Sequence, residues 1–560
     1  MGASPLDREF PGPAAAAARG ATHVVTNQPP PLVGYNAFSG DRILIEAARR
    51  ADAQWVEPEA KSLGALVGSE RMQVLADQAN RYGPVLRSHD RYGHRIDSVD
   101  FHPAYHELMS LAFGAGLHSL AWTAKRDGAF AARATLNYLW NQGEQGISCP
   151  VTMTFAGVQV LRHAPELSAE WEPKVIARAY DPRPLPIAQK TGATIGMAMT
   201  EKQGGSDLRA NTTVAVPTSG GYALTGHKWF CSAPMSDAFL ALARLEDRVT
   251  CFLVPRSLPD GSRNPFFLQR LKDKIGNRSN ASAEIEFAET FAHLVGPQGK
   301  GIATIIEMAH LTRFDIVVAS AGMMRAGLTQ ALHHAGHRTA FGKRLAEHAA
   351  MQNVLADLAL ESEAATLTAF RLAQAFDRGG ADPNERLLAR IMTPVAKYWL
   401  CKRNPVFTVE AMECLGGNGF VEDGPFGRLF RESPLNGIWE GSGNVICLDV
   451  LRSVERAPES LRALLAEIAL GASGNASVES MLARLEREFS DRSNLEGRAR
   501  RLVEMAAVAL QASLMQRHAD SRAADVFCTT RLGGDWGHVP GTLPAGTPCA
   551  ALLARPDFGA

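Results

Sequence analysis

Apolar residues recur every three to four positions along most of the chain, which is the spacing of one face of an α-helix. Between about residue 40 and residue 190 this spacing appears in SLGALVGSERMQVLADQANRYG and YHELMSLAFGAGLHSLAWTAKR. From Gly301 it returns in longer stretches, including GIATIIEMAHLTRFDIVVASAGMMRAGLTQALHHAGHR. Long helices joined by short connections predict an antiparallel bundle in the second half of the chain.

A different pattern separates the two helical regions. GYALTGHKWFCSAPMSDAFLALARLEDRVTCFLVPRSL and SAEIEFAET contain short apolar or alternating runs broken by Gly, Asp and Pro, which predicts an antiparallel β unit. The chain is therefore expected to be mainly α with a β domain, an α+β protein. The predicted divisions are a disordered extension (1–22), an N-terminal helical domain (23–190), a middle β domain (191–296), a C-terminal helical bundle (297–454), an extra helical segment (455–540) and a flexible tail (541–560).

Composition narrows the class of protein. The chain has 560 residues, 46% hydrophobic and 21% charged, which is typical of well-packed globular domains and too long for a single core. Lys plus Arg equals Asp plus Glu at 58 each, so the global charge predicts no polyanionic partner, although a local basic patch stays open. No run of 18 apolar residues occurs, and the N-terminus lacks the order of a signal peptide.

The cysteines and histidines give no metal site. Eight cysteines are scattered without a CxxC pair, which favours reduced thiols and a cytoplasmic location. His333 and His337 are spaced i, i+4, but no third ligand lies nearby in the sequence. Two exposed helix histidines are the favoured interpretation.

The first candidate for chemistry is GMAMTEKQGGSDLRANTT, residues 196–213, at the entrance to the β unit. Gly204 and Gly205 allow close approach of a ligand to the backbone, and the hydroxyls of Thr200 and Ser206 can bind a polar ring edge or a phosphate. An ordinary turn is the alternative for these residues alone.

Four further stretches contain candidate residues. Trp229 in GHKWFCS is typical of a core strand residue. Arg338 in HRTAFGKRLAEHAAMQ and the glycines of LGGNG (415–419) can grip a phosphate, or can simply end helices. In IWEGSGNV (438–445), Glu440 lies between an indole and small residues, which is unusual for a carboxylate.

Taken together and in this order, MTEKQGGSD, GHKWF, RLKDKIGNRSNAS, IWEGSGN and CLDVLR resemble the acyl-CoA dehydrogenase family, and within it the AidB-like alkylation-response branch. The resemblance covers about residues 60 to 455. It implies FAD as the cofactor and the acyl-CoA dehydrogenase fold, with an N-terminal helical domain, an antiparallel β-barrel-like middle domain and a C-terminal four-helix bundle, here followed by an extra helical segment.

The resemblance also assigns residues to the flavin. The isoalloxazine loop would comprise Met197, Met199, Thr200, Gly205 and Ser206. The strand beside the ring would comprise Trp229, Phe230, Cys231 and Ser232, where Cys231 stands in place of the usual hydroxyl and Ser232 is expected to serve instead. The adenine-side half, held across a subunit interface, would comprise Arg338, Phe341 and Gln352, with Gly416 and Gly417 facing the pyrophosphate. The loop around the base would comprise Ile438, Trp439, Gly441, Ser442, Gly443 and Asn444.

If these assignments hold, a monomer cannot carry a complete FAD site, and a homotetramer is expected. Glu440 would take a proton from Cα of an acyl-CoA thioester while the β-hydride passes to the flavin. Such a base needs a poorly solvated pocket that raises its pKa, and Trp439 is expected to supply it. The resemblance thus implies an FAD-dependent acyl-CoA dehydrogenase-type oxidoreductase, acting on a short branched acyl-CoA such as isovaleryl-CoA.

Two features leave an alternative open. Arg452, in CLDVLR, would either pair with Glu440 and lower its pKa or cap its own helix. In the AidB-like branch the extra segment is associated with duplex DNA, and its candidate contacts here are Arg492, Arg498, Arg500 and Arg501.

Arginines and acids nearly balance over that segment, which is equally typical of a solvated helix face. The alternative function is a DNA-binding flavoprotein of the adaptive response to alkylating agents with little acyl-CoA turnover. A flavoprotein with neither activity is the third interpretation.

Overall fold

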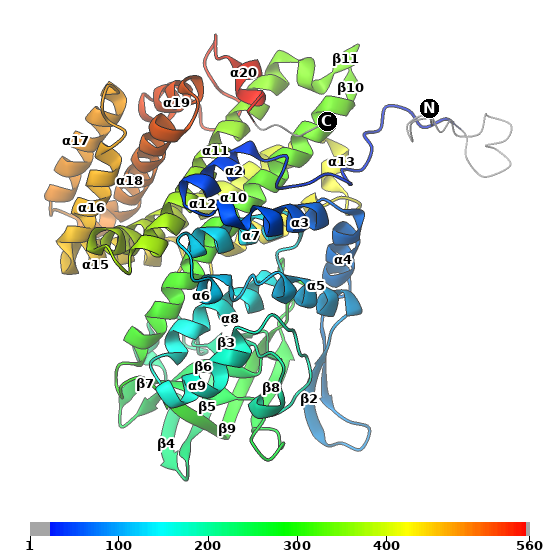
Figure 1. The fold of residues 1–560 in the computed structure, drawn as a ribbon, viewed down its shortest axis with the longest axis vertical. Helices are drawn as coiled ribbons and strands as arrows, with labels where there is room; N and C mark the ends of the chain where they lie inside the picture. The colour runs from blue at the N-terminus through cyan, green and yellow to red at the C-terminus, as the bar shows by residue number, and fades with distance from the viewer. Residues whose placement is uncertain (1–22, 556–560) are drawn as a thin grey trace.

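The computed structural model describes residues 23–555, so the predicted extension 1–22 and the last five residues lie outside the described part. Figure 1 shows a β domain at one end of the molecule and long helices running away from it. The N-terminal region is helical as expected, and it also contains a two-stranded hairpin. Its elements are α2 (Arg42–Arg50), α3 (Glu57–Val67), α4 (Glu70–Arg81), β1 (Val85–His89), β2 (Arg95–Asp100), α5 (Pro103–Gly114), α6 (Leu120–Thr123), α7 (Ala129–Gly143), α8 (Ser148–Leu161) and α9 (Pro165–Val175).

The middle β domain closes on itself. Strand pairing runs from β6 through β4, β5, β9 and β7 back to β6, with β3 on the edge of β6 and β8 on β9. Most pairs are antiparallel as predicted, but β3 and β4 pair with β6 in parallel, which the sequence pattern did not indicate. The strands are β3 (Ile195–Ala198), β4 (Val214–Thr218), β5 (Gly221–Ser232), β6 (Ala238–Leu245), β7 (Arg248–Pro255), β8 (Phe266–Leu271) and β9 (Ser282–Val295).

Alternation along β6 separates two cores. Phe239 and Ala241 point into the interior of the β domain, whereas Leu240 and Leu242 pack against α8 and α10. The apolar run of β6 is thus buried on both faces, and its outer face joins the β domain to the helices.

The C-terminal bundle is built on α10, a helix of 37 residues that is buried along most of its length. Arg133 of α7 is wholly buried and forms an ion pair with Asp315 of α10, which also accepts a hydrogen bond from Thr152 at 2.6 Å. These contacts tie α10 to the N-terminal domain. The remaining elements of the bundle are β10 (Thr339–Ala340), β11 (Lys343–Arg344), α11 (Ala349–Arg378), α12 (Pro383–Glu413), α13 (Gly417–Phe420), α14 (Phe426–Glu432) and α15 (Gly443–Arg456).

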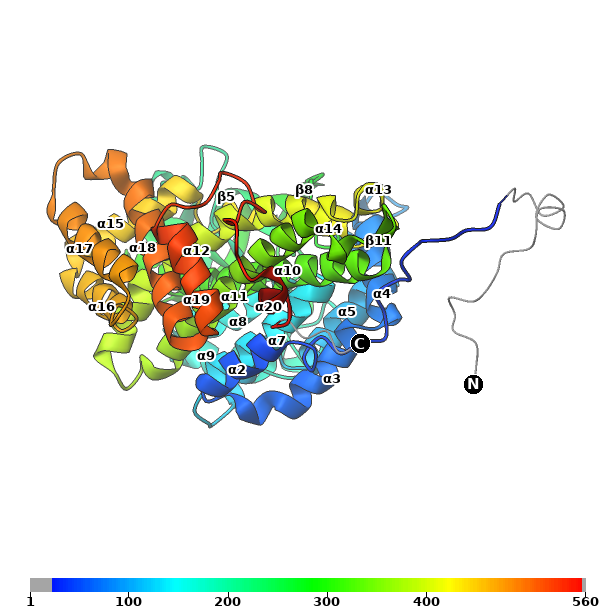
Figure 2. The same ribbon diagram turned by 90° about the horizontal axis from the view of Figure 1, so that it is seen from above.

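The extra segment is helical, as predicted, and packs on α11, α12 and α15 (Figures 1 and 2). Glu467 of this segment is buried between Arg371 of α11, at 2.8 Å, and Arg517, at 2.6 Å. The ion pairs fix the segment to the bundle. Its helices are α16 (Pro458–Ala469), α17 (Ala476–Ser490), α18 (Leu495–His518) and α19 (Ser521–Phe527), and α20 (Cys549–Leu553) follows beyond the segment.

Residues 541–555 differ from the flexible tail that the sequence predicts. The N–H of Gly541 donates to the buried carboxylate of Asp357, and Leu543 and Leu552 are buried against α11. Arg555 pairs with Glu363. The Gly and Pro residues of this stretch shape a loop that packs on the bundle.

Several expectations from composition can be compared with residues 23–555. All eight cysteines are free thiols, and seven are buried. Within the described range no helix combines the length and apolar character needed to cross a membrane, and no group of three or more potential metal ligands occurs. His333 and His337 each contact a backbone carbonyl, at 2.8 Å.

Candidate active site

Glu440 lies in the turn before α15, with a backbone φ of +57° that residues other than glycine rarely adopt. Two helices hold this conformation. Arg313 of α10 donates from Nε to the carbonyl of Glu440 at 2.9 Å. Lys397 of α12 donates to the carbonyls of Trp439 and Gly441, both at 2.8 Å. Such strain persists only where surrounding contacts impose it, and it is common at functional sites.

The carboxyl of Glu440 is a stronger base than an ordinary glutamate. Burial raises its pKa, and this effect exceeds the lowering by Arg313, by Lys397 and by a hydrogen bond from Thr312. Arg313 is itself shared, because it forms an ion pair with Asp449 at 2.8 Å. The positive charge of Arg313 is therefore largely balanced by Asp449 and not by Glu440.

Of the two roles expected for Arg452, the structure does not show the pairing with Glu440 that would lower the pKa of that acid. Arg452 is exposed on α15, and among residues 23–555 it forms no ion pair with Glu440. The cations near Glu440 are Arg313 and Lys397, and sequence reasoning missed both. No local pattern marks Arg313, because it lies 127 residues from Glu440 on a buried helix.

The loop from the β domain and the Glu440 turn both contribute side chains to one apolar cluster. Met197 and Met199, at the end of β3, are half-buried in the same apolar cluster as Trp439, together with Cys149 of α8. A Cβ added at Gly205 would lie 2.4 Å from Oγ1 of Thr200, so only glycine fits there. The loop thus packs tightly and leaves the Thr200 hydroxyl half-buried and that of Ser206 exposed.

A buried ion pair fixes this loop to the neighbouring strand. Nζ of Lys228 lies 2.7 Å from the Glu201 carboxylate, and both side chains are completely buried. Burial lowers the pKa of Lys228 to about 8. Burial alone would raise the pKa of Glu201, but the Lys228 ammonium and hydrogen bonds from Thr212 and Thr213 hold it well below its usual range. Both residues lie inside the motifs MTEKQGGSD and GHKWF, yet sequence reasoning did not pair them.

At the end of β5 the candidate flavin residues lie on two faces of the strand, one toward the interior of the β domain and one away from it. Cys231 is fully buried in the interior of the β domain, so its thiol does not share the surface of its neighbours. Phe230 is 49% exposed and Ser232 is half-buried on the other face. The structure therefore turns Cys231 away and leaves Ser232 as the hydroxyl beside the site. Trp229 is half-buried, and Nζ of Lys272 lies 3.6 Å from its ring centroid.

The adenine-side residues gather at the far end of α10. Arg338 follows the last turn of α10 and donates to the carbonyl of Asn27 at 2.5 Å, while Asn418 of the GGNG stretch donates to Gln28 at 3.1 Å. Figure 1 places β10, β11 and α13 in the part of the molecule away from the β domain. Phe341 has a φ of +49° and a side chain that is 98% exposed. The glycines Gly416 and Gly417 have open space around their Cα atoms.

The two groups of candidate residues are far apart within one chain. Arg313, which contacts Glu440, and Arg338 are separated by 25 residues, and at 1.5 Å per residue α10 places them about 37 Å apart. That distance exceeds the length of an extended FAD molecule. Gln352, in the first turn of α11, donates to Ala346 at 2.9 Å and lines a cavity beneath residues 543–551.

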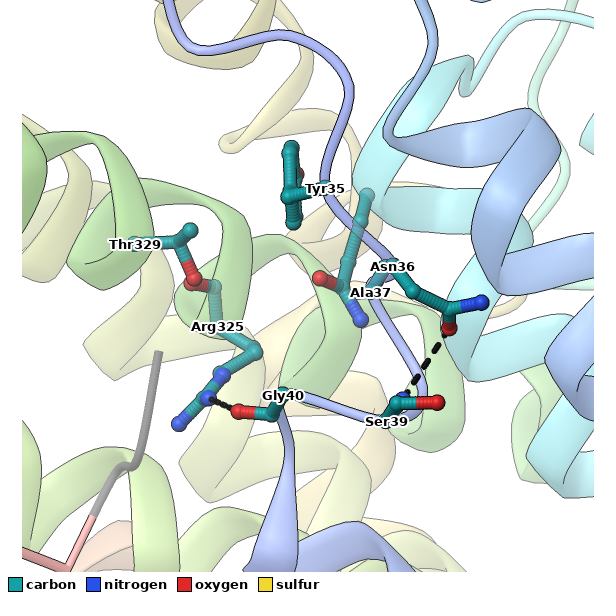
Figure 3. Close-up of a pocket in the computed structure, with 8 residues that line it drawn as sticks. Tyr35, Asn36, Ala37, Ser39, Gly40, Arg325 and Thr329 are labelled. Carbon is teal, nitrogen blue, oxygen red and sulfur yellow. Dashed lines mark hydrogen bonds between the residues drawn. The ribbon is translucent and has the colours of Figure 1, made fainter. Parts of the chain in front are cut away.

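A separate cavity of about 200 Å³ lies between residues 35–40, α7 and α10 (Figure 3). The guanidinium of Arg325 on its wall contacts Asp41 at 3.2 Å and the carbonyl of Gly40 at 3.0 Å. Arg325 is 12 residues beyond Arg313 on α10, about 18 Å along the helix. This cavity is therefore not part of the Glu440 site.

The arginines of the extra segment are not equivalent. Arg498 pairs with Glu488 at 2.7 Å and with Asp491 at 3.3 Å. Arg492, Arg500 and Arg501 are exposed near the start of α18. Arg500 also approaches the Glu440 turn, since a Cβ added at Gly443 would lie 3.1 Å from its Nη2. Ser442 and Asn444 are exposed beside it, and Ile438 is 64% exposed.

Comparison with known proteins defines the class. The model of the acyl-CoA dehydrogenase middle domain matches residues 196–290, and that of the acyl-CoA dehydrogenase C-terminal domain matches residues 299–455. The chain belongs to the acyl-CoA dehydrogenase family. Residues 27–182 match the model of the adaptive response protein AidB N-terminal domain, so the chain carries the domain set of the AidB-like branch.

Individual relatives agree with this assignment. The chain is 47% identical over 438 residues to a putative acyl-CoA dehydrogenase, AidB, of Escherichia coli K12, covering 78% of this chain and 81% of that protein. It is 30% identical to acyl-CoA dehydrogenase family member 11 of Caenorhabditis elegans, over 75% and 70% of the two chains. A crystal structure of the C. elegans protein ACDH-11 in complex with C11-CoA has a TM-score of 0.83 at 26% identity, and covers 92% of this chain and 93% of that one.

Family membership supports FAD as the cofactor, and the residues present fit it. The half-buried Met197 and Met199 suit a flat apolar ring, and the hydroxyls of Thr200 and Ser232 suit its polar edge. Gly205 admits no side chain where a cofactor would pass the loop. The site thus offers an apolar platform with hydrogen-bonding groups at its rim.

The Glu201–Lys228 pair predicts a specific pattern of stability. Lys228→Met leaves the Glu201 carboxylate buried without a cation and is expected to lower the free energy of unfolding by about 3–5 kcal/mol. The double variant Glu201→Gln with Lys228→Met should lose less, because no uncompensated charge is then buried and the amide oxygen still accepts the Thr212 N–H, although the Thr213 N–H loses its acceptor. Urea denaturation measures both, with the exposed Lys202→Met as control. A single variant no less stable than the double variant would contradict the assignment.

Proposed function

We propose that the protein catalyses the FAD-dependent α,β-dehydrogenation of an acyl-CoA thioester, with Glu440 as the base. The reaction breaks Cα–H and Cβ–H bonds and forms a C=C bond, with the α-proton passing to the Glu440 carboxylate. When bound, FAD supplies the acceptor for the β-hydrogen and its electron pair. The observation that carries the proposal is a buried carboxyl with a raised pKa, in a strained turn whose Trp439 packs against the same apolar cluster as Met197 and Met199 of the candidate flavin loop.

The residues of the chain divide the work. Within the turn, Arg313 and Lys397 hydrogen-bond to backbone carbonyls and so fix where Glu440 points, and they lower its pKa by less than burial raises it. Trp439 joins the apolar cluster and restricts water at the carboxylate. A base whose pKa lies closer to neutrality than that of a solvated glutamate removes an α-proton more effectively.

The acyl group is proposed to be short and branched, as in isovaleryl-CoA. Relatives at lower identity include an isovaleryl-CoA dehydrogenase of Oryza sativa, 26% identical over 54% of this chain. The C. elegans structure contains C11-CoA, so longer chains belong in the test as well. The free thiols favour a reducing compartment such as the cytoplasm.

Glu440→Gln tests the base. In anaerobic mixing with a panel of acyl-CoAs from isovaleryl-CoA to C11-CoA, the wild-type protein should lose its oxidised flavin absorbance with at least one of them. The variant should do so about 10²- to 10⁴-fold more slowly, because the amide cannot accept the proton. Glu455→Gln, an exposed acid on α15, the helix that follows the Glu440 turn, is the control. Bleaching by no acyl-CoA, or equal rates in the two variants, would refute the proposal.

We further propose that FAD is bound between subunits of a homotetramer. Support comes from the separation of about 37 Å between Arg313 and Arg338, too long for one cofactor. It also comes from exposed aromatics at the adenine-side residues, with Phe341 98% and Phe420 81% exposed. Large exposed apolar side chains that lie together are typical of interfaces.

Complementation tests the shared site. Arg338→Ala and Glu440→Gln should each abolish flavin reduction by acyl-CoA. Co-expressed chains should recover part of it, because a Glu440 from one chain then meets an Arg338 from the other. Sedimentation checks that mixed tetramers form. Mixed tetramers as inactive as either parent would show that each chain builds its own site.

A second candidate function is non-specific binding of duplex DNA by the extra segment. It is favoured by the exposed Arg492 and Arg501 near the start of α18, neither of which forms a described ion pair within residues 23–555. Phosphate contacts of this kind lose affinity steeply with salt.

The double variant Arg492→Ala with Arg501→Ala should weaken the mobility shift on duplex DNA. The slope of log affinity against log salt concentration should become shallower by up to about 2, one unit for each lost phosphate contact. Arg462→Ala, on the exposed side of α16, is the control. An unchanged shift, or no shift for the wild-type protein at low salt, would exclude this surface.

A further inference from the structure

Three polar side chains form a line from the loop after β8 to the candidate flavin face. Nζ of Lys274 donates to Oγ of Ser282 at 3.1 Å, and Oγ of Ser282 lies 3.2 Å from Oγ of Ser232. Ser282 begins β9 and Ser232 ends β5, and the two are paired in register. Lys274 lies in the stretch RLKDKIGNRSNAS, which otherwise has no role in the proposed reaction.

The lysine gives this line a direction. An ammonium has three donors and no acceptor, so Ser282 must accept from it. Because a hydroxyl can accept twice, either Ser282 or Ser232 can be the donor between them. Where Ser282 donates, Ser232 keeps its own proton for another acceptor, which is either Cys149, its further hydrogen-bond partner, or a ring edge on the face it shares with Phe230. Hydrogen bonds in such a chain polarise one another, and a charged first member strengthens the effect.

Among the titratable groups near Ser282 and Ser232, Lys274 is the one that carries a charge in mildly acidic solution. Lys274 also donates to the carbonyl of Asn280 at 2.5 Å, and burial lowers its pKa to about 8. Its titratable neighbours are Cys149, Glu432 and Arg278. Burial raises the pKa of Cys149 to about 12 and that of Glu432 to about 7. In mildly acidic solution both neighbours are therefore neutral, and the exposed Arg278 lies within 3.6 Å of Asp273.

We propose that Lys274 is a positioning residue that acts through Ser282 and Ser232 to raise the reduction potential of the flavin bound at this site. This inference rests on the proposed function, because it requires FAD at the Ser232 face. A fixed donor backed by a buried cation stabilises the electron-rich reduced ring more than the oxidised ring. The three residues thereby favour electron transfer from the substrate without touching it.

The test is the midpoint potential of bound FAD, measured by equilibration with a reference dye about two pH units below the pKa of Lys274. Lys274→Met and Ser282→Ala should each lower the potential by at least about 30 mV, which for two electrons is a tenfold loss in relative stability of the reduced flavin. Lys125→Met, which removes an exposed lysine, should leave it unchanged.

The outcomes separate this inference from the proposed function. An unchanged potential in FAD-loaded Lys274→Met would overturn the role of Lys274 and leave the proposed function standing. If that variant fails to fold, Ser282→Ala decides, and an unchanged potential there would overturn the inference equally. Failure of the wild-type protein to bind FAD would overturn the proposed function itself.

Discussion

The site depends on the backbone of Glu440, which is held in a left-handed conformation by Arg313 and Lys397. Both cations are buried or nearly so on helices of the bundle, and both bind carbonyl oxygens of the turn. The two cations therefore stabilise the main-chain conformation of the turn. Burial has the larger effect on the carboxyl and raises its pKa. If either contact were lost, the turn would relax and the acid would move toward solvent.

A second fixed point lies across the site. The buried pair Glu201–Lys228 fastens the loop that carries Thr200 and Gly205 to strand β5. Replacing a buried pair with apolar residues is often neutral for stability, so such a pair is better explained by the single arrangement it imposes. Here that arrangement fixes the β-domain loop, whose Met197 and Met199 pack against the same apolar cluster as Trp439 beside the acid.

Much of the fold could be predicted from the sequence. The order of helical, β and helical regions follows from periodicity, and Glu440 was recognisable because a carboxylate among apolar and small neighbours is rare. What could not be predicted are contacts between distant positions. Arg313 lies 127 residues from Glu440, and Lys228 lies 27 residues from Glu201. The inward turn of Cys231 depends on the register of β5, and the packing of residues 541–555 depends on the buried Asp357 of α11, neither of which has a local signal.

The most direct test of the central claim is the pH dependence of flavin reduction in the FAD-loaded wild-type protein, mixed anaerobically with the acyl-CoA that reduces it fastest. The rate should rise with pH through one ionisation whose pKa lies above the ordinary glutamate value of about 4.3, because the base must be unprotonated and burial raises its pKa. A rate independent of pH, or an ionisation at or below the ordinary glutamate value, would contradict a buried Glu440 as the base.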